Sequence, residues 1–217
     1  MKKSFIILLR VIFVLIVILL ITFFGLRSFF LYESKQAIDT ALVVGDAPVL
    51  GDASATFSVV EFFDYRCSHC AVMSALVDEA IADDKTIKII LRPVALIEDE
   101  SFLISSFVLA ADKQKDGAGI VLHKDIMALG HVPDLVEVQS LARARGINVE
   151  QADIDSRRED IQVEVNRNTE LVRDIGFGVV PSLVIGDRGY LPRDQMPSVN
   201  ELKLMILDAK ARLAVQN

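Results

Sequence analysis

The sequence contains only two cysteines, and both lie in the segment Cys67-Ser68-His69-Cys70. Two cysteines cannot build a multi-disulfide scaffold, so we expect this pair to react rather than to brace a fold. At the start of a helix, a Cys-x-x-Cys pair commonly has a first thiol of lowered pKa, because unpaired backbone N–H groups and the helix dipole favour the thiolate. The spacing therefore predicts a redox pair in which Cys67 attacks and Cys70, one turn later, resolves the mixed disulfide.

His69 lies between the cysteines and can donate a hydrogen bond or positive charge to the Cys67 thiolate. A stabilised thiolate stabilises the reduced form, so the disulfide is passed on to a substrate more readily, which favours an oxidase. Two alternatives stay open, an inert or buried cysteine pair and a zinc or copper site. A closed metal site needs a fourth ligand, and we expect the other histidines, His123 and His131, at the surface rather than as ligands.

The cysteine motif follows a nearly continuous apolar segment, Phe57 to Phe63, which predicts a buried central strand. Apolar residues at helical spacing predict a helix from Ser68 to Ala82. Another β-branched segment, Thr86 to Arg92, predicts the next strand and completes a βαβ unit. The cysteines are thus expected at a strand-to-helix junction.

The rest of the chain predicts a helical block followed by a return to strands. The expected helices are Glu100 to Lys113, Gly117 to Leu129, Pro133 to Arg145 with Pro133 as the first helical residue, and Glu150 to Ile175 with a break near Arg157 to Asp160. The expected later elements are a strand at Ser182 to Ile185, a turn at Gly186 to Gly189, a strand at Tyr190 to Leu191 and a helix at Val199 to Val215. This order predicts one α/β domain over residues 57–217 with a helical insertion at about 98–172.

The N-terminal segment from Phe5 to Phe24 is apolar except for Arg10. Twenty helical residues span about 30 Å, the thickness of the hydrocarbon core of a bilayer. We expect residues 1–31 to be an uncleaved membrane anchor, with a cleaved leader as the alternative. Lys2 and Lys3 precede the span, so the positive-inside rule predicts a cytoplasmic N-terminus and an exported domain. Residues 32–56 are expected to be a linker, with a short helix over 32–44.

Charge excludes one class of partner. Of the 23 basic residues, four lie within residues 1–30, which leaves 19 against 30 acidic residues, a net charge of −11 for the remainder. Nucleic acid is therefore not expected as a partner.

The segment Glu61-Phe-Phe-Asp-Tyr-Arg-Cys-Ser-His-Cys70 resembles the active-site motif of the DsbA-like branch of the thioredoxin superfamily, commonly Glu-Phe-Phe-x-x-x-Cys-Pro-His-Cys. Ser68 departs from the frequent proline. Gly178-Val-Val-Pro-Ser182 is similar to the loop that carries a cis-proline opposite the cysteines. Residues 141–147 and 165–172 look like the helical insertion of the membrane-attached and ScsC-like members.

This resemblance implies a thioredoxin fold with an inserted helical subdomain, preceded by one transmembrane helix, and no bound cofactor beyond the cysteines. It implies a cis Val180-Pro181 bond, with Pro181 aligning the substrate backbone beside the sulfurs. It also implies that Glu61 is a buried acid that relays a proton when Cys70 attacks; burial would raise its pKa as a relay requires. The alternative for Glu61 is a hydrated carboxylate on an edge strand.

We therefore expect a protein disulfide oxidase in the bacterial inner membrane whose catalytic domain is periplasmic. It would donate the Cys67-Cys70 disulfide to unfolded or cysteine-containing exported proteins, and a membrane redox partner would reoxidise it. One alternative is an isomerase or reductase kept reduced by a different membrane partner, with a homo-oligomer through Phe29 to Val44 as an option. Another is an envelope copper-binding or chaperone-like module.

Overall fold

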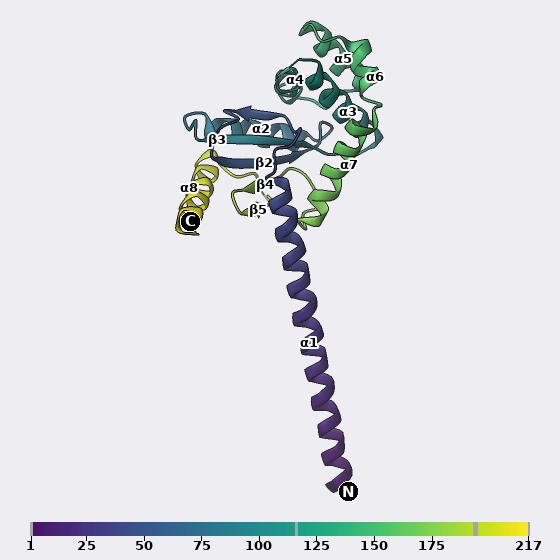
Figure 1. The fold of residues 1–217 in the computed structure, drawn as a ribbon, viewed down its shortest axis with the longest axis vertical. Coiled ribbons are helices and arrows are strands. Elements are labelled where there is room, and N and C mark those ends of the chain that lie inside the picture. The colour runs from purple at the N-terminus through teal and green to yellow at the C-terminus, as the bar shows by residue number, and fades with distance from the viewer. Residues whose placement is uncertain (1, 116, 193–194, 217) are drawn as a thin grey trace. The chain divides into compact units, whose positions relative to one another are not determined.

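The computed structural model describes residues 2–115, 117–192 and 195–216 (Figure 1). The chain divides into two compact units, residues 1–36 and 37–217. Helix α1, Lys2–Ala41, accounts for the first unit and enters the second. Within the described residues, one helical segment is long and apolar enough to cross a membrane, Ile12–Ala41 of α1.

The helix predicted over residues 32–44 is present as far as Ala41, but it is the end of α1 rather than a short helix of its own, because α1 continues without a break to Ala41. The chain becomes more polar at Ser34-Lys35-Gln36, but these residues do not break helices. The first strong helix breaker after Gly25 is Gly45, whose φ is +53°. A change from apolar to polar residues along the sequence therefore does not by itself mark the end of a helix.

The second unit is built on a five-stranded sheet with the order β1-β3-β2-β4-β5. Its strands are β1 Val49–Gly51, β2 Phe57–Phe63, β3 Ile87–Pro93, β4 Ser182–Ile185 and β5 Arg188–Tyr190. Strands β2 and β3 are parallel and are joined by helix α2, Ser68–Ile81, and every other pair is antiparallel. The βαβ prediction is confirmed, and β2 is the central strand.

Residues 37–56 belong to the fold, so for this part the linker prediction is wrong. Strand β1 pairs with β3, with Val49 opposite Ile90, and three residues are too short to show an alternating pattern. The buried guanidinium of Arg92 in β3 donates hydrogen bonds to the carbonyl oxygens of Ala41 and Val43. This arginine attaches the end of α1 to the sheet.

Each face of the sheet carries its own apolar core, because side chains alternate along β2. Val59 and Phe63 pack with α2 and with helix α8, Val199–Gln216. Val60 and Phe62 pack on the opposite face with the last turn of α1 and with helix α7, Glu159–Asp174. The cysteines therefore lie on the α2 face.

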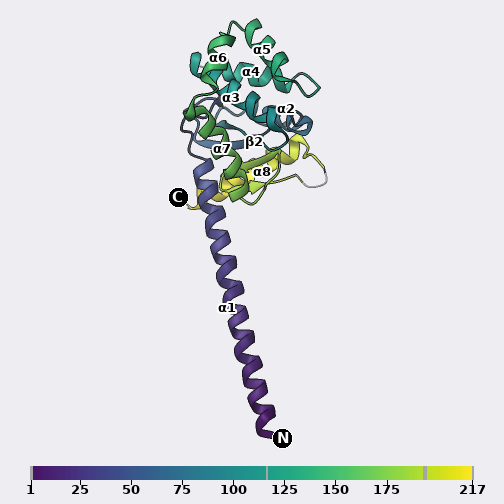
Figure 2. The same ribbon diagram turned by 90° about the vertical axis from the view of Figure 1, so that its right-hand side faces the viewer.

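The helical insertion comprises α3 Asp99–Gln114, α4 Ala118–Met127, α5 Leu135–Ala144, α6 Val149–Asp155 and α7. Figures 1 and 2 show α3 to α6 gathered in one block, while α7 returns along the sheet, where it contacts β3. The break predicted near 157–160 is confirmed. Pro133 is not the first helical residue: Asp134 caps α5 by accepting a hydrogen bond from the Glu137 N–H at 2.8 Å.

The hairpin between β4 and β5 is tighter than the predicted turn at 186–189. Ile185 pairs directly with Arg188, so the loop contains only two residues, and Gly186 supplies the positive φ of +61°. Gly189 lies in β5 rather than in the turn, and a Cβ there would overlap the ring of Phe177. This glycine reflects a close approach of an aromatic ring, which local sequence does not reveal.

Candidate active site

Asp64 organises the loop that joins β2 to the cysteine helix. Its carboxylate is fully buried; Oδ1 accepts a hydrogen bond from the Arg66 N–H at 2.9 Å, and Oδ2 accepts from the N–H groups of Leu96 and Ile97 at 2.9 and 3.1 Å. Its carbonyl oxygen accepts from the Cys67 N–H at 3.0 Å. An aspartate whose side chain accepts a hydrogen bond from the N–H two residues later forms an Asx turn, a role of Asp64 that the sequence analysis missed.

Cys67 is the N-cap residue of α2, as the strand-to-helix prediction requires. It is half-buried, and its sulfur lies 4.0 Å from the carbonyl oxygen of Val180. Cys70 is fully buried beneath it, and both cysteines are free thiols in this structure. One sulfur of the pair is thus accessible and the other is not.

The two thiols differ strongly in acidity. A hydrogen bond from the Cys70 thiol lowers the pKa of Cys67 to about 6, against the opposing effects of burial and Asp64, and the backbone N–H groups of Cys70 and His69 add to the lowering. Burial, together with the neighbouring Cys67 sulfur, raises the pKa of Cys70 far above its ordinary value. At neutral pH, Cys67 is therefore a thiolate and Cys70 a thiol.

His69 is exposed and lies at the edge of a groove beside Cys67. Within the described residues its ring makes no hydrogen bond, and the group that acts on the Cys67 sulfur is its backbone N–H. The proposed action of the imidazole on the thiolate stays a prediction.

The Val180-Pro181 bond is cis, which confirms the conformation implied by the resemblance. Pro181 lies in the loop whose Val180 carbonyl faces the Cys67 sulfur. The groove there has a volume of about 390 Å³, and the residues that line it are His69, Val179, Val180, Pro181, Leu191, Pro192, Gln195 and Met196. An extended peptide segment lying in this groove would pass beside the accessible sulfur.

Glu61 is only 1% exposed and lies in the central strand, so the edge-strand alternative is wrong. Its Oε1 atom has no hydrogen-bond partner within the described residues. Burial, with a smaller contribution from the charge of Asp78, raises the pKa of Glu61 to about 8. Glu61 therefore carries a proton at neutral pH.

The two remaining histidines lie in different environments. His131 is exposed and contacts Glu137 at 3.0 Å, as expected of a surface residue. His123 is buried, so its surface prediction is wrong: its ring centroid lies 4.7 Å from that of Phe63, and Nε2 lies 3.3 Å from the Ser74 hydroxyl. In the described part of the chain, no group of three or more histidine, cysteine or acidic side chains could hold a metal ion.

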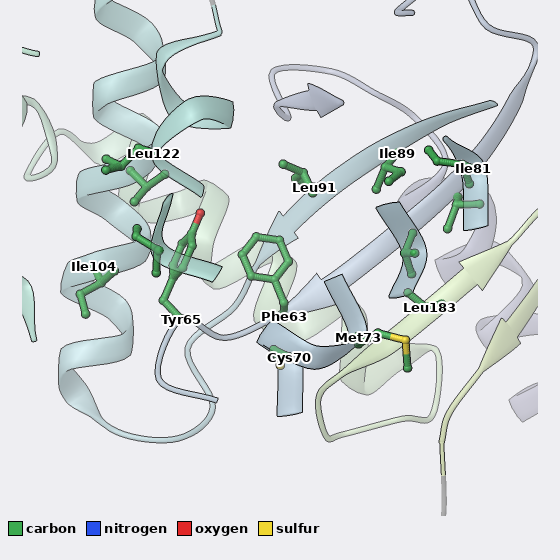
Figure 3. Close-up of a cluster of buried hydrophobic side chains, with 14 of the residues drawn as sticks. Phe63, Tyr65, Cys70, Met73, Ile81, Ile89, Leu91, Ile104, Leu122 and Leu183 are labelled. Atoms are coloured by element: carbon green, nitrogen blue, oxygen red, sulfur yellow. The ribbon is translucent and has the colours of Figure 1, made fainter. Parts of the chain in front are cut away.

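Buried side chains connect the cysteines to both the sheet and the insertion (Figure 3). Cys70 lies close to Phe63 of β2, while Tyr65 extends toward Ile104 and Leu122 of the insertion. The rings of Phe63 and Tyr65 meet edge to face, with centroids 5.1 Å apart. The active-site loop is thus held from both sides.

Comparisons with known proteins agree with this geometry. A ScsC variant from Proteus mirabilis is 21% identical, with a TM-score of 0.73 over 86% of this chain and 87% of that chain. A thioredoxin-like oxidoreductase from Silicibacter pomeroyi is 26% identical, with a TM-score of 0.69 over 81% and 96% of the two chains. The thiol-disulfide exchange protein alpha-DsbA2 from Wolbachia pipientis is 22% identical, with a TM-score of 0.71 over 81% and 95%. No curated protein matches the chain.

The family profile described as a DSBA-like thioredoxin domain matches residues 58–202, more than half of the chain. This range contains Glu61, both cysteines and Pro181. The chain therefore belongs to the DsbA-like thioredoxin domain family, whose members are thiol-disulfide oxidoreductases.

Proposed function

We propose that this chain is an envelope oxidase that donates the Cys67-Cys70 disulfide to exported proteins. The difference in acidity between the two sulfurs supports this proposal: Cys67 has a pKa lowered to about 6, whereas that of Cys70 is raised. A stabilised Cys67 thiolate stabilises the reduced enzyme, so the oxidised enzyme is a strong disulfide donor.

In the proposed reaction, a substrate thiolate attacks the Cys67 sulfur and the Cys67-Cys70 bond breaks. Cys70 receives the electron pair of that bond and a proton from Glu61. A second substrate thiolate then attacks the substrate sulfur of the mixed disulfide, and Cys67 leaves as a thiolate. The substrate loses two electrons and the enzyme gains them.

Pro181 and the groove around it would hold the substrate backbone beside Cys67, and the exposed His69 would contact substrate at the edge of the groove. A membrane redox partner would restore the disulfide by removing two electrons, and α1 would keep the domain close to that partner. The basic residues ahead of the apolar segment favour a cytoplasmic N-terminus and a periplasmic domain.

The test uses the full oxidised chain in detergent and a reduced, unfolded model protein with two cysteines. We expect one substrate disulfide per enzyme disulfide, and complete loss of this activity in both Cys67→Ser and Cys70→Ser, because neither variant can hold the Cys67-Cys70 disulfide. When Cys70→Ser is mixed instead with the oxidised form of the same model protein, Cys67 should attack the substrate disulfide and form a mixed disulfide that Cys70 cannot resolve. If the protein rescues a scrambled substrate but leaves a reduced one unoxidised, it is an isomerase. Alkylation of both thiols in intact cells provides a second check, because an oxidase is held mainly oxidised.

A further inference from the structure

Helix α2 presents polar residues at four-residue intervals, Cys70, Ser74 and Asp78. Residues at this spacing lie on one face of a helix, and eight residues cover about 12 Å along its axis. Cys70 and Ser74 are buried, whereas Asp78 is partly exposed. One face of α2 therefore leads from the buried sulfur to the surface.

Glu61 lies on the strand beneath this face. In a βαβ unit the helix runs back antiparallel to the strand that precedes it, so the start of α2 lies near Phe63 and its later turns lie near Val59. Along β2 these two residues are about 13 Å apart, similar to the length of helix from Cys70 to Asp78. Both belong to the core formed with α2, so Glu61, midway between them, faces the same helix. Glu61 is thus placed between Cys70 and Asp78.

Asp78 reaches solvent together with Lys124 of α4. The Asp78 Oδ2 and Lys124 Nζ atoms are 3.6 Å apart, and both residues line a cavity of about 450 Å³ that opens to the surface. The Asp78 side chain is 37% exposed and that of Lys124 is 53% exposed. Asp78 can therefore exchange protons with water, which the buried Glu61 cannot do directly.

Two buried titratable side chains near this face, His123 and Tyr65, are neutral at working pH. Burial lowers the pKa of His123 on α4 to about 3 and raises that of Tyr65 in the active-site loop well above its ordinary value. From the surface side, the charge of Asp78 acts on Glu61, and Lys124 is the cation that pairs with Asp78.

We propose that Asp78, held by Lys124, is the outer carboxylate of a proton path that runs through Glu61 to the sulfur of Cys70. The proposal rests on the roles proposed above for Cys70 and Glu61. When the Cys67-Cys70 bond breaks, Cys70 takes the electron pair and the proton of Glu61, which becomes a carboxylate. Asp78 takes a proton from water and passes it to Glu61; when the disulfide re-forms, the same path runs in reverse. Asp78 acts through Glu61 and is a positioning residue.

The experiment follows the protonation of Glu61 in the full chain in detergent, by infrared spectroscopy of the protonated carboxyl group. Ordinary carboxyl groups are ionised near neutral pH, so the remaining band is that of Glu61 and disappears in Glu61→Gln. In Asp78→Asn, loss of the nearby negative charge lowers the midpoint of this band by on the order of one pH unit. The pH profile for reduction of the enzyme disulfide by dithiothreitol shifts in the same direction, while the Cys67 titration is unchanged.

The matched control is Glu79→Gln, which removes the same charge from the neighbouring, exposed position of α2 and leaves the Glu61 midpoint in place. An unchanged midpoint in Asp78→Asn, or an equal shift in Glu79→Gln, overturns the proposal. The infrared titration needs no protein substrate, so it still decides the proposal if the chain fails to oxidise reduced proteins.

Discussion

Replacing Cys70 with alanine tests the origin of the acidity of Cys67. The hydrogen bond from the Cys70 thiol is the largest cause of the lowered pKa, ahead of the backbone N–H groups of α2. A hydrogen bond to a charged group contributes about 1.5–3 kcal/mol, which corresponds to about 1–2 pKa units. Because Cys67 is half-buried, water screens part of this effect, and we expect the pKa to rise from about 6 by nearer 1 unit than 2.

The measurement is the rate of alkylation by iodoacetamide as a function of pH in the full chain in detergent. Cys70→Ala has a single thiol, so its rate reports Cys67 alone; in the wild type, peptide mass spectrometry separates the two sites. Cys70→Ser keeps a hydroxyl donor, so we expect less than half of the alanine effect. If Cys70→Ala titrates at the wild-type pH, the helix N-terminus rather than the resolving thiol sets the acidity. A wild-type midpoint near 9 would remove the main support for the oxidase proposal.

Folding lowers the pKa of Cys67, so its thiolate stabilises the reduced protein. This stabilisation is fully present above the ordinary pKa of 9.0 and is lost as the pH falls through about 6. Urea unfolding of the reduced and the oxidised protein across this range measures the difference in their free energies of unfolding. Burial lowers the pKa of His123 to about 3, so unfolding takes up a proton below about pH 6.5, and the free energy of unfolding decreases as the pH is lowered from there. At about pH 4.5 we expect His123→Phe to avoid a loss of about 2–3 kcal/mol, measured in thermal melts. Asp64→Ala leaves three backbone N–H groups without their acceptor and should cost about 2–4 kcal/mol in urea unfolding, whereas Asp64→Asn, which keeps one oxygen, should cost less. Arg92→Met removes the partner of Glu164, 2.8 Å away, and should cost about 2–4 kcal/mol, part of which the double variant with Glu164→Gln recovers.

The strand-to-helix junction was predictable because its signals are local. The apolar segment of β2 and the helical spacing after Cys67 each lie within one element. The polar break between α6 and α7 is likewise visible in a few consecutive residues. Strand β1 has no such signal, because its three residues are ordered by pairing with β3 about forty residues later. The missed parts of the fold depend on partners that lie far away in the sequence.

The same distinction applies to the site. The position of Cys67 at a helix start follows from the local sequence pattern. The Asp64 carboxylate, in contrast, accepts hydrogen bonds from the N–H groups of Leu96 and Ile97, about thirty residues away. The burial of His123 depends on packing of α4 against Phe63 and α2, which one helix cannot reveal. The placement of Pro181 opposite Cys67 came from family resemblance, since no spacing rule connects residues more than a hundred positions apart.

The outer strands of the sheet, β1 and β5, contain three residues each. An exposed sheet edge is a template on which another unpaired strand can add, and short edge strands offer few free backbone groups for such pairing. The clients that we propose are newly exported chains that still expose strands of their own. If these are the substrates, short edges at both sides would allow the protein to meet such aggregation-prone chains repeatedly without being incorporated into their aggregates.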